Sequence, residues 1–303
     1  MNGSYYPNPL DQFKRFFSSK TALPRLILIN IFIFAVVNLV QLFLWLFRVQ
    51  TEQGLSLITS FLAVPASIDT LALKPWTIFT YMFFHEGFFH LLFNMMVLYF
   101  GGIIFMQYLN ERQLISTYLF GGLTGAAFYV MAFNFFPVFL EATPFAIALG
   151  ASASVLSILI AIATYVPHYT VNLLFIGQVK LKYLAIFFIL MDIFSIQGDN
   201  PGGHIAHLGG AFWGILYGIT LRYHFDILPF THLKRKKSNM RVKTPGVNSS
   251  GSTNRRPLSD DDYNKQKNIN QQQIDQILDK ISRSGYESLT QTEKAILFKN
   301  SKQ

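Results

Sequence analysis

Six apolar segments alternate with shorter polar or glycine-rich stretches between residues 26 and 221. The first of them, residues 26–47, carries no charge and has about the length that a helix needs to cross a lipid bilayer. Similar segments follow at about residues 88–108, 114–136, 146–165, 183–195 and 204–221. This pattern predicts an all-α membrane protein whose core is a six-transmembrane-helix bundle.

Two of the connecting stretches are long enough to have structure of their own. Residues 48–74 contain Pro65 and are too polar to cross a membrane. Residues 171–182 are apolar but interrupted by glycine and lysine, and we expect them to form a loop that reaches the membrane interface. Because the fifth span is short, its start could reach back toward Leu173.

The composition supports a membrane protein and explains the basic charge. The chain is 51% hydrophobic, with 31 phenylalanines among 303 residues, which is more apolar than most soluble domains. The net charge is +9, and with the N-terminus inside, the outer loops hold only Arg48 and Lys74 among the lysines and arginines. This asymmetry predicts a multi-pass protein of the cell membrane, expected to be the bacterial inner membrane, with both termini cytoplasmic. It also means that no nucleic-acid partner is needed to explain the charge.

The absence of cysteine narrows the chemistry. It excludes a disulfide scaffold, a cysteine-ligated metal and a cysteine nucleophile.

Outside the membrane domain, expected at residues 25–225, the chain is polar. Residues 1–24 form a cytoplasmic N-terminal segment, and residues 226–270 are expected to be a basic, then disordered, linker. In residues 271–303, Ile274, Ile277, Leu278 and Ile281 have the spacing of an amphipathic helix that ends at Gly285, and Thr290 with Glu293 has the pattern of a capping box before a second helix. We expect a short cytoplasmic helical hairpin, which either binds a cytoplasmic partner or simply ends the chain.

Polar side chains inside apolar spans are costly and tend to be functional. His90 and Asn94 share one face of the second span, while Ser152 and His207 begin the fourth and sixth spans, so all four lie at one membrane level. A serine nucleophile needs a base and donors for the developing oxyanion. We therefore expect Ser152 as nucleophile and His207 as base, with oxyanion donors from His90, Asn94 and the Ser152 N–H. Asp192, on the fifth span, is the one acid at this level within the spans; it could pair with a histidine, but we expect it to face water at the membrane edge, which favours a Ser–His dyad over a triad.

His85 and His90 superficially look like the two histidines of a zinc-protease helix. That motif needs histidines four residues apart on one helix face, whereas these are five apart, and Gly87 places His85 in the preceding loop. No metal site is expected here.

Short motifs in a fixed order add a family resemblance over about residues 25–225. They are Pro75-Trp76, Thr80-Tyr81-Met82-Phe83-Phe84-His85, His90-Leu91-Leu92-Phe93-Asn94-Met95, Gly150-Ala151-Ser152 and Ala206-His207-Leu208-Gly209-Gly210. In this order and spacing, the chain resembles the rhomboid family of intramembrane serine proteases.

The resemblance implies the same roles for Ser152, His207, His90 and Asn94, and a structural, hydrogen-bonding role for His85 in the first loop. It implies cleavage of transmembrane helices of other proteins near the outer membrane face, without a cofactor; the partners are therefore transmembrane substrates and the lipid bilayer. Trp76 is expected to be an interfacial anchor, and Gly150 and Gly210 are expected to be structural, since the glycines at 210, 214 and 218 form a close-packing face.

Two positions depart from the family pattern. Ala153 stands where the family usually has glycine, and its methyl group is expected to crowd the sixth span unless Gly209 or Gly210 lies opposite. Leu156 replaces an aromatic residue that often supports the catalytic histidine. These departures keep open a catalytically inactive rhomboid-like protein that binds transmembrane clients. A metal or haem protein using the histidines at 85, 90, 204 and 207 ranks last, because no carboxylate ligand is expected beside them.

Overall fold

The computed structural model describes residues 8–48, 57–174, 176–228, 276–277, 279–281 and 288–293. The chain divides into two compact units, Met1–Lys237 and Ser238–Gln303, which are described separately.

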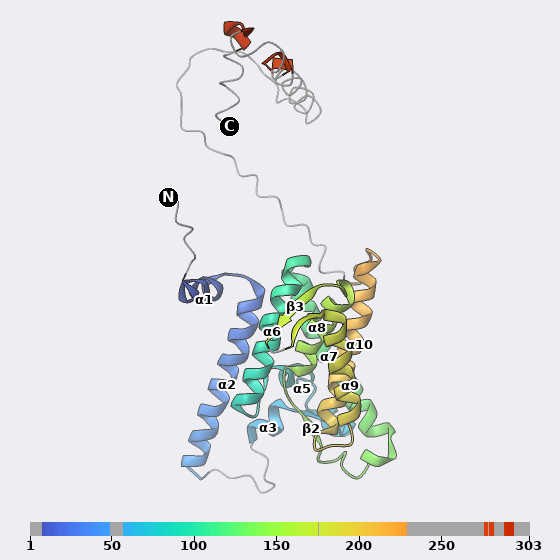
Figure 1. Ribbon diagram of the computed structural model, residues 1–303. Coiled ribbons are helices and arrows are strands. Elements are labelled where there is room, and N and C mark those ends of the chain that lie inside the picture. The colour runs from blue at the N-terminus through green and yellow to red at the C-terminus, as the bar shows by residue number, and fades with distance from the viewer. Residues whose placement is uncertain are drawn as a thin grey trace, which may run out of the picture. The chain divides into compact units, whose positions relative to one another are not determined.

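The first unit is a bundle of long helices around α8 (Ser152–Tyr165). Every residue of α8 from Ala153 to Ala163 is buried, and the helix packs most extensively against α10 (Pro201–Arg222) and α7 (Glu111–Phe135), then against α6 (Phe88–Tyr108). Figure 1 shows α2 (Ala22–Leu46) at one edge of the bundle, beyond α6, with α9 (Leu181–Ser195) beside α10. A short helix, α1 (Pro9–Ser18), precedes α2.

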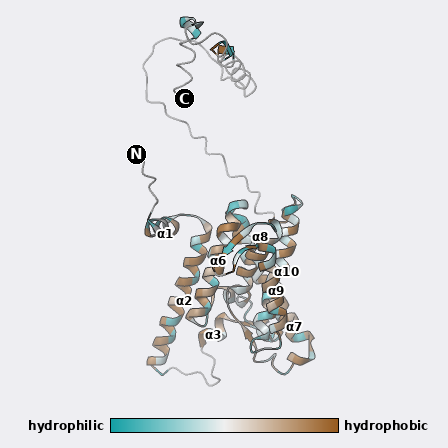
Figure 2. Cartoon of the chain, viewed as in Figure 1, coloured by the Kyte–Doolittle hydropathy of each residue, from teal (hydrophilic) through white to brown (hydrophobic). Residues whose placement is uncertain are grey.

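Three of these helices, α2, α6 and α7, are long and apolar enough to cross a membrane, and α8 is a shorter apolar helix. Large side chains such as Phe32, Phe93 and Met131 project from the bundle with most of their surface exposed. Figure 2 shows the apolar colour running along most of α2 and α6. The prediction of a helical membrane protein is therefore confirmed, and each of the six expected segments overlaps one helix of at least 14 residues, three of which are long enough to span.

The expected fourth span begins too early in the sequence prediction. Ile147–Ala148 is a strand, β2, which pairs antiparallel with β1 (Val64–Pro65), with Val64 opposite Ala148. The Ala66 N–H extends the pairing by donating to the Ala146 carbonyl at 2.9 Å. Because these backbone groups are engaged in a ladder and Gly150 has a φ of 123°, the helix starts only at Ser152.

The expected interfacial loop at residues 171–182 is also wrong in detail. It forms a β-hairpin of β3 (Thr170–Leu173) and β4 (Gly177–Lys180), with Gly177 at a φ of 87°. The side chains of β3 alternate between exposed and partly buried, which is the period of a strand. As a result α9 begins at Leu181 and does not reach back to Leu173.

The polar stretch before α6 folds into three short helices and a 3₁₀ turn. They are α3 (Leu57–Leu62), α4 (Ile68–Leu73), α5 (Thr77–Thr80) and the turn η1 (Tyr81–Phe83). The Trp76 indole N–H donates to the Phe61 carbonyl at 2.9 Å, and the Thr80 hydroxyl donates to the Leu62 carbonyl at 2.8 Å. Trp76 therefore holds this segment together. A second 3₁₀ turn, η2 (Pro137–Phe139), follows α7.

Glycines let α10 approach the backbone of α8. A Cβ atom on Gly210 would collide with the Ala153 backbone, one on Gly214 would lie 2.7 Å from the Ser157 carbonyl oxygen, and one on Gly218 would lie 2.7 Å from the Ala161 carbonyl oxygen. These contacts advance by four residues in both helices, so α8 and α10 run parallel. The close-packing face expected from the sequence is confirmed.

In the second unit, the capping box is confirmed. The Thr290 N–H donates to Glu293 Oε2 at 2.8 Å, the Glu293 N–H donates to Thr290 Oγ1 at 3.4 Å, and Lys280 pairs with Glu293 at 2.9 Å. Ile277 is buried. The other residues of the expected hairpin, at 274, 278, 285, 297 and 298, lie outside the described residues.

The glycine face gives a stability prediction. We expect Gly214→Val to lower the free energy of unfolding by about 1–3 kcal/mol, because the added side chain meets the α8 backbone with no room to move. Gly87→Ser is the matched control, since a Cβ there meets nothing within 4 Å and serine suits the start of α6. Denaturation of the purified proteins in detergent measures both; equal stability of Gly214→Val and the wild type would contradict the packing described.

Candidate active site

Gly150 brings a serine and a histidine together at the start of α8. Its N–H donates to the Tyr81 carbonyl at 2.9 Å, so η1 fixes its position. A Cβ on Gly150 would lie 2.9 Å from the Nε2 of His90 and 3.5 Å from the Oγ of Ser152, and the φ of 123° favours glycine in any case. The His90 imidazole and the Ser152 hydroxyl thus converge over a position that only glycine can occupy.

Of the three serines near the start of α8, Ser152 alone is not fully buried. Ser157 is fully buried and donates to the Thr117 carbonyl at 2.9 Å. Ser154 is fully buried as well, and its Oγ faces Gly122 of α7, where an added Cβ would lie 2.6 Å away. Ser152 is only partly buried. Among these hydroxyls, a substrate can therefore reach only Ser152.

His207 lies close to Ser152 because the adjacent residues, Ala206 and Ala153, both contact Gly125 of α7. A Cβ on Gly125 of α7 would lie 2.6 Å from the Ala153 Cβ and 2.9 Å from the Ala206 carbonyl oxygen. Ala153 follows Ser152, and Ala206 precedes His207, so the serine and the histidine flank the contact of three helices. In the described part of the chain, no hydrogen bond joins Ser152 Oγ to His207.

The sequence prediction weighed a pairing of Asp192 with a histidine but did not choose it. The Asp192 Oδ1 lies 2.7 Å from Nδ1 of His207 and 2.8 Å from Nδ1 of His204, and the residue is 6% exposed. The expectation that Asp192 faces water at the membrane edge is wrong, because α9 turns this side chain into its contact with α10. The signal was present in the sequence, since a single carboxylate inside an apolar span is costly unless it is paired.

Donors for an oxyanion lie on α6 and α8. Asn94 is buried and donates one amide hydrogen to the His90 carbonyl at 2.9 Å, which leaves its second amide hydrogen for another acceptor. The Ser152 N–H lies in the first turn of α8, where backbone N–H groups have no acceptor within the helix. The His90 ring completes this set beside Gly150.

His85 lies in the loop before α6, as expected, but packs rather than hydrogen-bonds. Its ring is 1% exposed and meets the His90 ring edge-on at a centroid distance of 5.2 Å. Neither ring nitrogen makes a hydrogen bond of ordinary geometry with the described residues. Burial, and then the nearby His90, lower the pKa of His85 to about 4, against a weaker opposing effect of the Phe83 backbone.

The Ala153 methyl group fits without displacing α10. It points toward Gly125 of α7, while Gly210 of α10 packs on the Ala153 backbone. The expected compensation by Gly210 is therefore present, and a second glycine from α7 accommodates the methyl group itself. Leu156 is buried and offers no ring to His207; the His204 ring lies at a centroid distance of 5.9 Å from that of His207.

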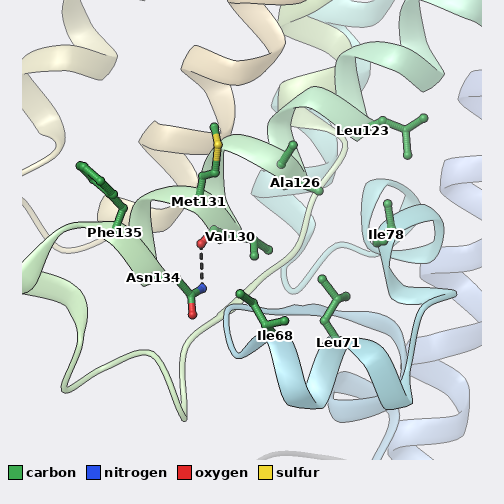
Figure 3. Close-up of a pocket in the computed structure, with 10 residues that line it drawn as sticks. Ile68, Leu71, Ile78, Leu123, Ala126, Val130, Met131, Asn134 and Phe135 are labelled. Atoms are coloured by element: carbon green, nitrogen blue, oxygen red, sulfur yellow. Dashed lines mark hydrogen bonds between the residues drawn. The ribbon is translucent and has the colours of Figure 1, made fainter.

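Two cavities flank this region. A largely polar cavity of about 640 Å³ reaches His90 and Leu149, and its other lining residues include Gln41, Thr59, Glu86, Asn200 and Gly203. An apolar cavity of about 420 Å³ lies between α4, α5 and α7, with Ile68, Leu71 and Ile78 facing Ala126 and Val130 (Figure 3). The first is lined by several polar side chains that can bind water, whereas Asn134 is the one polar side chain among the described residues that line the second.

The four histidines considered as metal or haem ligands fall into two pairs. His204 and His207 join Asp192, with ligand atoms within 4.8 Å of one another, so the expectation that no carboxylate lies beside them is wrong. His85 and His90 form the other pair. We interpret the 2.7 and 2.8 Å separations at Asp192 as hydrogen bonds, because they have the length of a charge-assisted N–H···O bond.

The fold and this site define a helical membrane protein with serine, histidine and asparagine side chains gathered at one end of the bundle. Residues 72–224, just over half of the chain, match the Rhomboid domain, and the chain belongs to the rhomboid family, whose members are generally intramembrane serine proteases. Residues 259–303 match a family of unknown function, DUF6576.

Curated relatives share the rhomboid part of the chain. RHOMBOID-like protein 12, mitochondrial, of Arabidopsis thaliana is 31% identical over 144 residues, which are 45% of this chain and 43% of the relative. Presenilin-associated rhomboid-like protein A, mitochondrial, of Danio rerio is 29% identical over 182 residues, 56% of this chain and 44% of the relative. The chain thus spans less than half of the length of these relatives.

The relatives correct the expected location. Both are named as mitochondrial proteins, as is the Bos taurus relative, which is 28% identical over 199 residues, 62% of this chain and 45% of the relative. The expectation of a bacterial inner membrane with cytoplasmic termini is therefore wrong, and the comparison points to a mitochondrial membrane. Charge asymmetry orders the two sides of a membrane but does not identify the membrane.

The buried His85 predicts a pH-dependent stability. Its pKa falls from 6.5 in the unfolded chain to about 4 in the folded protein, so below about pH 6.5 the unfolded state binds more protons. Its contribution to the free energy of unfolding is therefore lost as the pH falls from 6.5 to 4, by roughly 3 kcal/mol in total. Denaturation of wild type and His85→Gln across this window should show a shallower loss in the variant, and parallel profiles would contradict the assignment.

Proposed function

We propose that the protein is an intramembrane serine endopeptidase that hydrolyses peptide bonds of transmembrane proteins near the membrane face at which α8 and α10 begin. The observation that carries the proposal is the position of Ser152, which is partly buried and has its Oγ beside the His90 ring over Gly150, while its neighbour Ala153 meets Ala206, the neighbour of His207, at Gly125. Membership of the rhomboid family supports it, and the relatives favour a mitochondrial membrane as its place.

The proposed reaction has two steps, acylation of Ser152 and hydrolysis of the resulting ester. His207 Nε2 takes the proton of Ser152 Oγ as the oxygen attacks the substrate carbonyl carbon, and the oxyanion is stabilised by the Ser152 N–H with the side chains of Asn94 and His90. The intermediate collapses as His207 gives its proton to the departing amine, which leaves an ester on Ser152. A water molecule, activated in the same way by His207, then releases the carboxylate and restores the serine. No cofactor takes part.

The cavity of about 640 Å³ suits the second step. Its lining includes the side chains of Gln41, Thr59, Glu86 and Asn200, and it reaches His90. Polar walls of this kind hold water in a site that is surrounded by apolar helices. Hydrolysis of the ester needs that water, because a dry site would stop at the acyl-enzyme.

An inactive client-binding protein is the alternative that Ala153 and Leu156 raised. The fit of the Ala153 methyl group against Gly125 removes the steric argument for it. Leu156 leaves His207 without a supporting aromatic ring from α8, but the Asp192 carboxylate contacts the same imidazole. Neither Ala153 nor Leu156 therefore argues for an inactive site.

The protease proposal predicts a strict division between the serines. Ser152→Ala and His207→Ala should each reduce cleavage of a transmembrane reporter by at least about 1,000-fold, because each removes a group that the bond-making step requires. Ser154→Ala is the matched control and should retain cleavage, since its hydroxyl faces α7. A fluorophosphonate probe should label the wild type and Ser154→Ala but not Ser152→Ala. Undiminished cleavage by Ser152→Ala would overturn the proposal.

A further inference from the structure

We infer that Asp192 is a positioning residue for His207: its carboxylate selects the imidazole tautomer and orientation that catalysis needs, and His204 is the second donor that holds this carboxylate in place. The inference rests on the proposed function, in which His207 is the base. It replaces the Ser–His dyad expected from the sequence by a serine, a histidine and a carboxylate drawn from three helices, α8, α10 and α9.

Two histidines of α10 approach one carboxylate oxygen of α9. His204 and His207 are three residues apart on α10, so both project from one helix face. Their Nδ1 atoms approach the same oxygen, Asp192 Oδ1, at 2.8 and 2.7 Å. The two rings are almost perpendicular, at 87°, so each presents its Nδ1 edge to the carboxylate without stacking on the other.

The hydrogen bonds to Asp192 determine which ring nitrogen of each histidine carries the proton. An ionised carboxylate can only accept hydrogen bonds, so both Nδ1 atoms must carry the proton. In neutral His207 the Nε2 atom then has a free lone pair. Nε2 is the atom that must receive the serine proton. When Nε2 takes that proton, the ring becomes positively charged next to the Asp192 carboxylate, which stabilises the charge as it forms.

The two histidines offset the cost of burying the Asp192 carboxylate. Asp192 is 6% exposed, and a buried carboxylate is costly unless hydrogen bonds replace its water. His204 and His207 both supply such bonds, while His204 and His207 themselves keep about a quarter of their side-chain surface exposed. His204 therefore shares the task of holding the acid, whereas the outer side of His207 remains free for the serine and the substrate.

The position of Asp192 also couples α9 to the site. Only Leu181, Ala185 and Asp192 are buried on α9, so within this helix Asp192 is the one polar side chain that reaches the interior. Its two hydrogen bonds are made to α10. A shift of α9 away from α10 would thus separate the carboxylate from His207 and lower the activity while Ser152 stays in place.

The test compares Asp192→Asn, Asp192→Glu and Asp199→Asn in the full-length protein in detergent. Asp192→Asn keeps the shape but removes the charge, and we expect kcat for a transmembrane substrate to fall by at least about 100-fold with KM changed by less than about threefold. Asp192→Glu should recover part of the loss, because it restores the carboxylate. Asp199, an exposed acid on the turn before α10, is the matched control, and Asp199→Asn should leave kcat unchanged. Equal kcat for Asp192→Asn and the wild type would overturn the inference.

A second measurement keeps the inference separate from the proposed function. Nitrogen NMR of ¹⁵N-histidine-labelled Ser152→Ala protein reports the His207 tautomer without any catalysis. We expect a protonated Nδ1 and an unprotonated Nε2, and a loss of this signature in Ser152→Ala/Asp192→Asn. If the wild type neither cleaves the substrate nor reacts with the probe, the protease proposal is overturned. The NMR signature of His207 still tests the positioning role of Asp192 in that case. An unprotonated Nδ1, or one zinc ion per wild-type molecule that Asp192→Asn loses, would overturn the positioning role.

Discussion

The close approach of α10 to α8 is the contact on which the rest of the structure depends. Glycines at 210, 214 and 218 place the α10 backbone against the α8 backbone, and Gly125 of α7 opens the space where Ala153 and Ala206 meet. Because the two helices run parallel and in contact, residues one turn before Gly210 fall beside the start of α8. Backbone packing thus sets the separation of Ser152 and His207, with no long or flexible side chain between them.

Asp192 shows how a polar cluster can be stable among apolar helices. A lone carboxylate at this place would be strongly unfavourable, and each imidazole alone would have an undefined tautomer. Together, the three side chains satisfy one another across the α9–α10 interface. Removing Asp192 takes the shared partner from both imidazoles, whereas removing one histidine leaves the carboxylate with a single imidazole donor.

The sequence predicts the helices better than the connections between them. The predicted range of α6, residues 88–108, matches the helix to the residue. In a membrane helix both the lipid-facing and the core-facing positions are apolar, so the length of the apolar segment is the main signal. The sequence misplaces the start of α8, since the β1–β2 pairing joins residues more than 80 positions apart and leaves no local pattern. Ser152, His207, His90 and Asn94 can be selected from their depth, their helix faces and the chemistry that a serine nucleophile needs. Asp192 cannot, because its role depends on which face α9 turns toward α10.

The length of α8 has a consequence for how the protein meets the bilayer. Its fourteen residues span about 21 Å, whereas the hydrocarbon layer is about 30 Å thick. With Tyr165 at one boundary of that layer, Ser152 lies roughly 10 Å inside the other. Since residues 153–163 are buried by protein, the surrounding helices carry any adjustment to membrane thickness and Ser152 keeps its depth. For the proposed protease, the substrate bond would therefore have to reach Ser152 below the membrane surface.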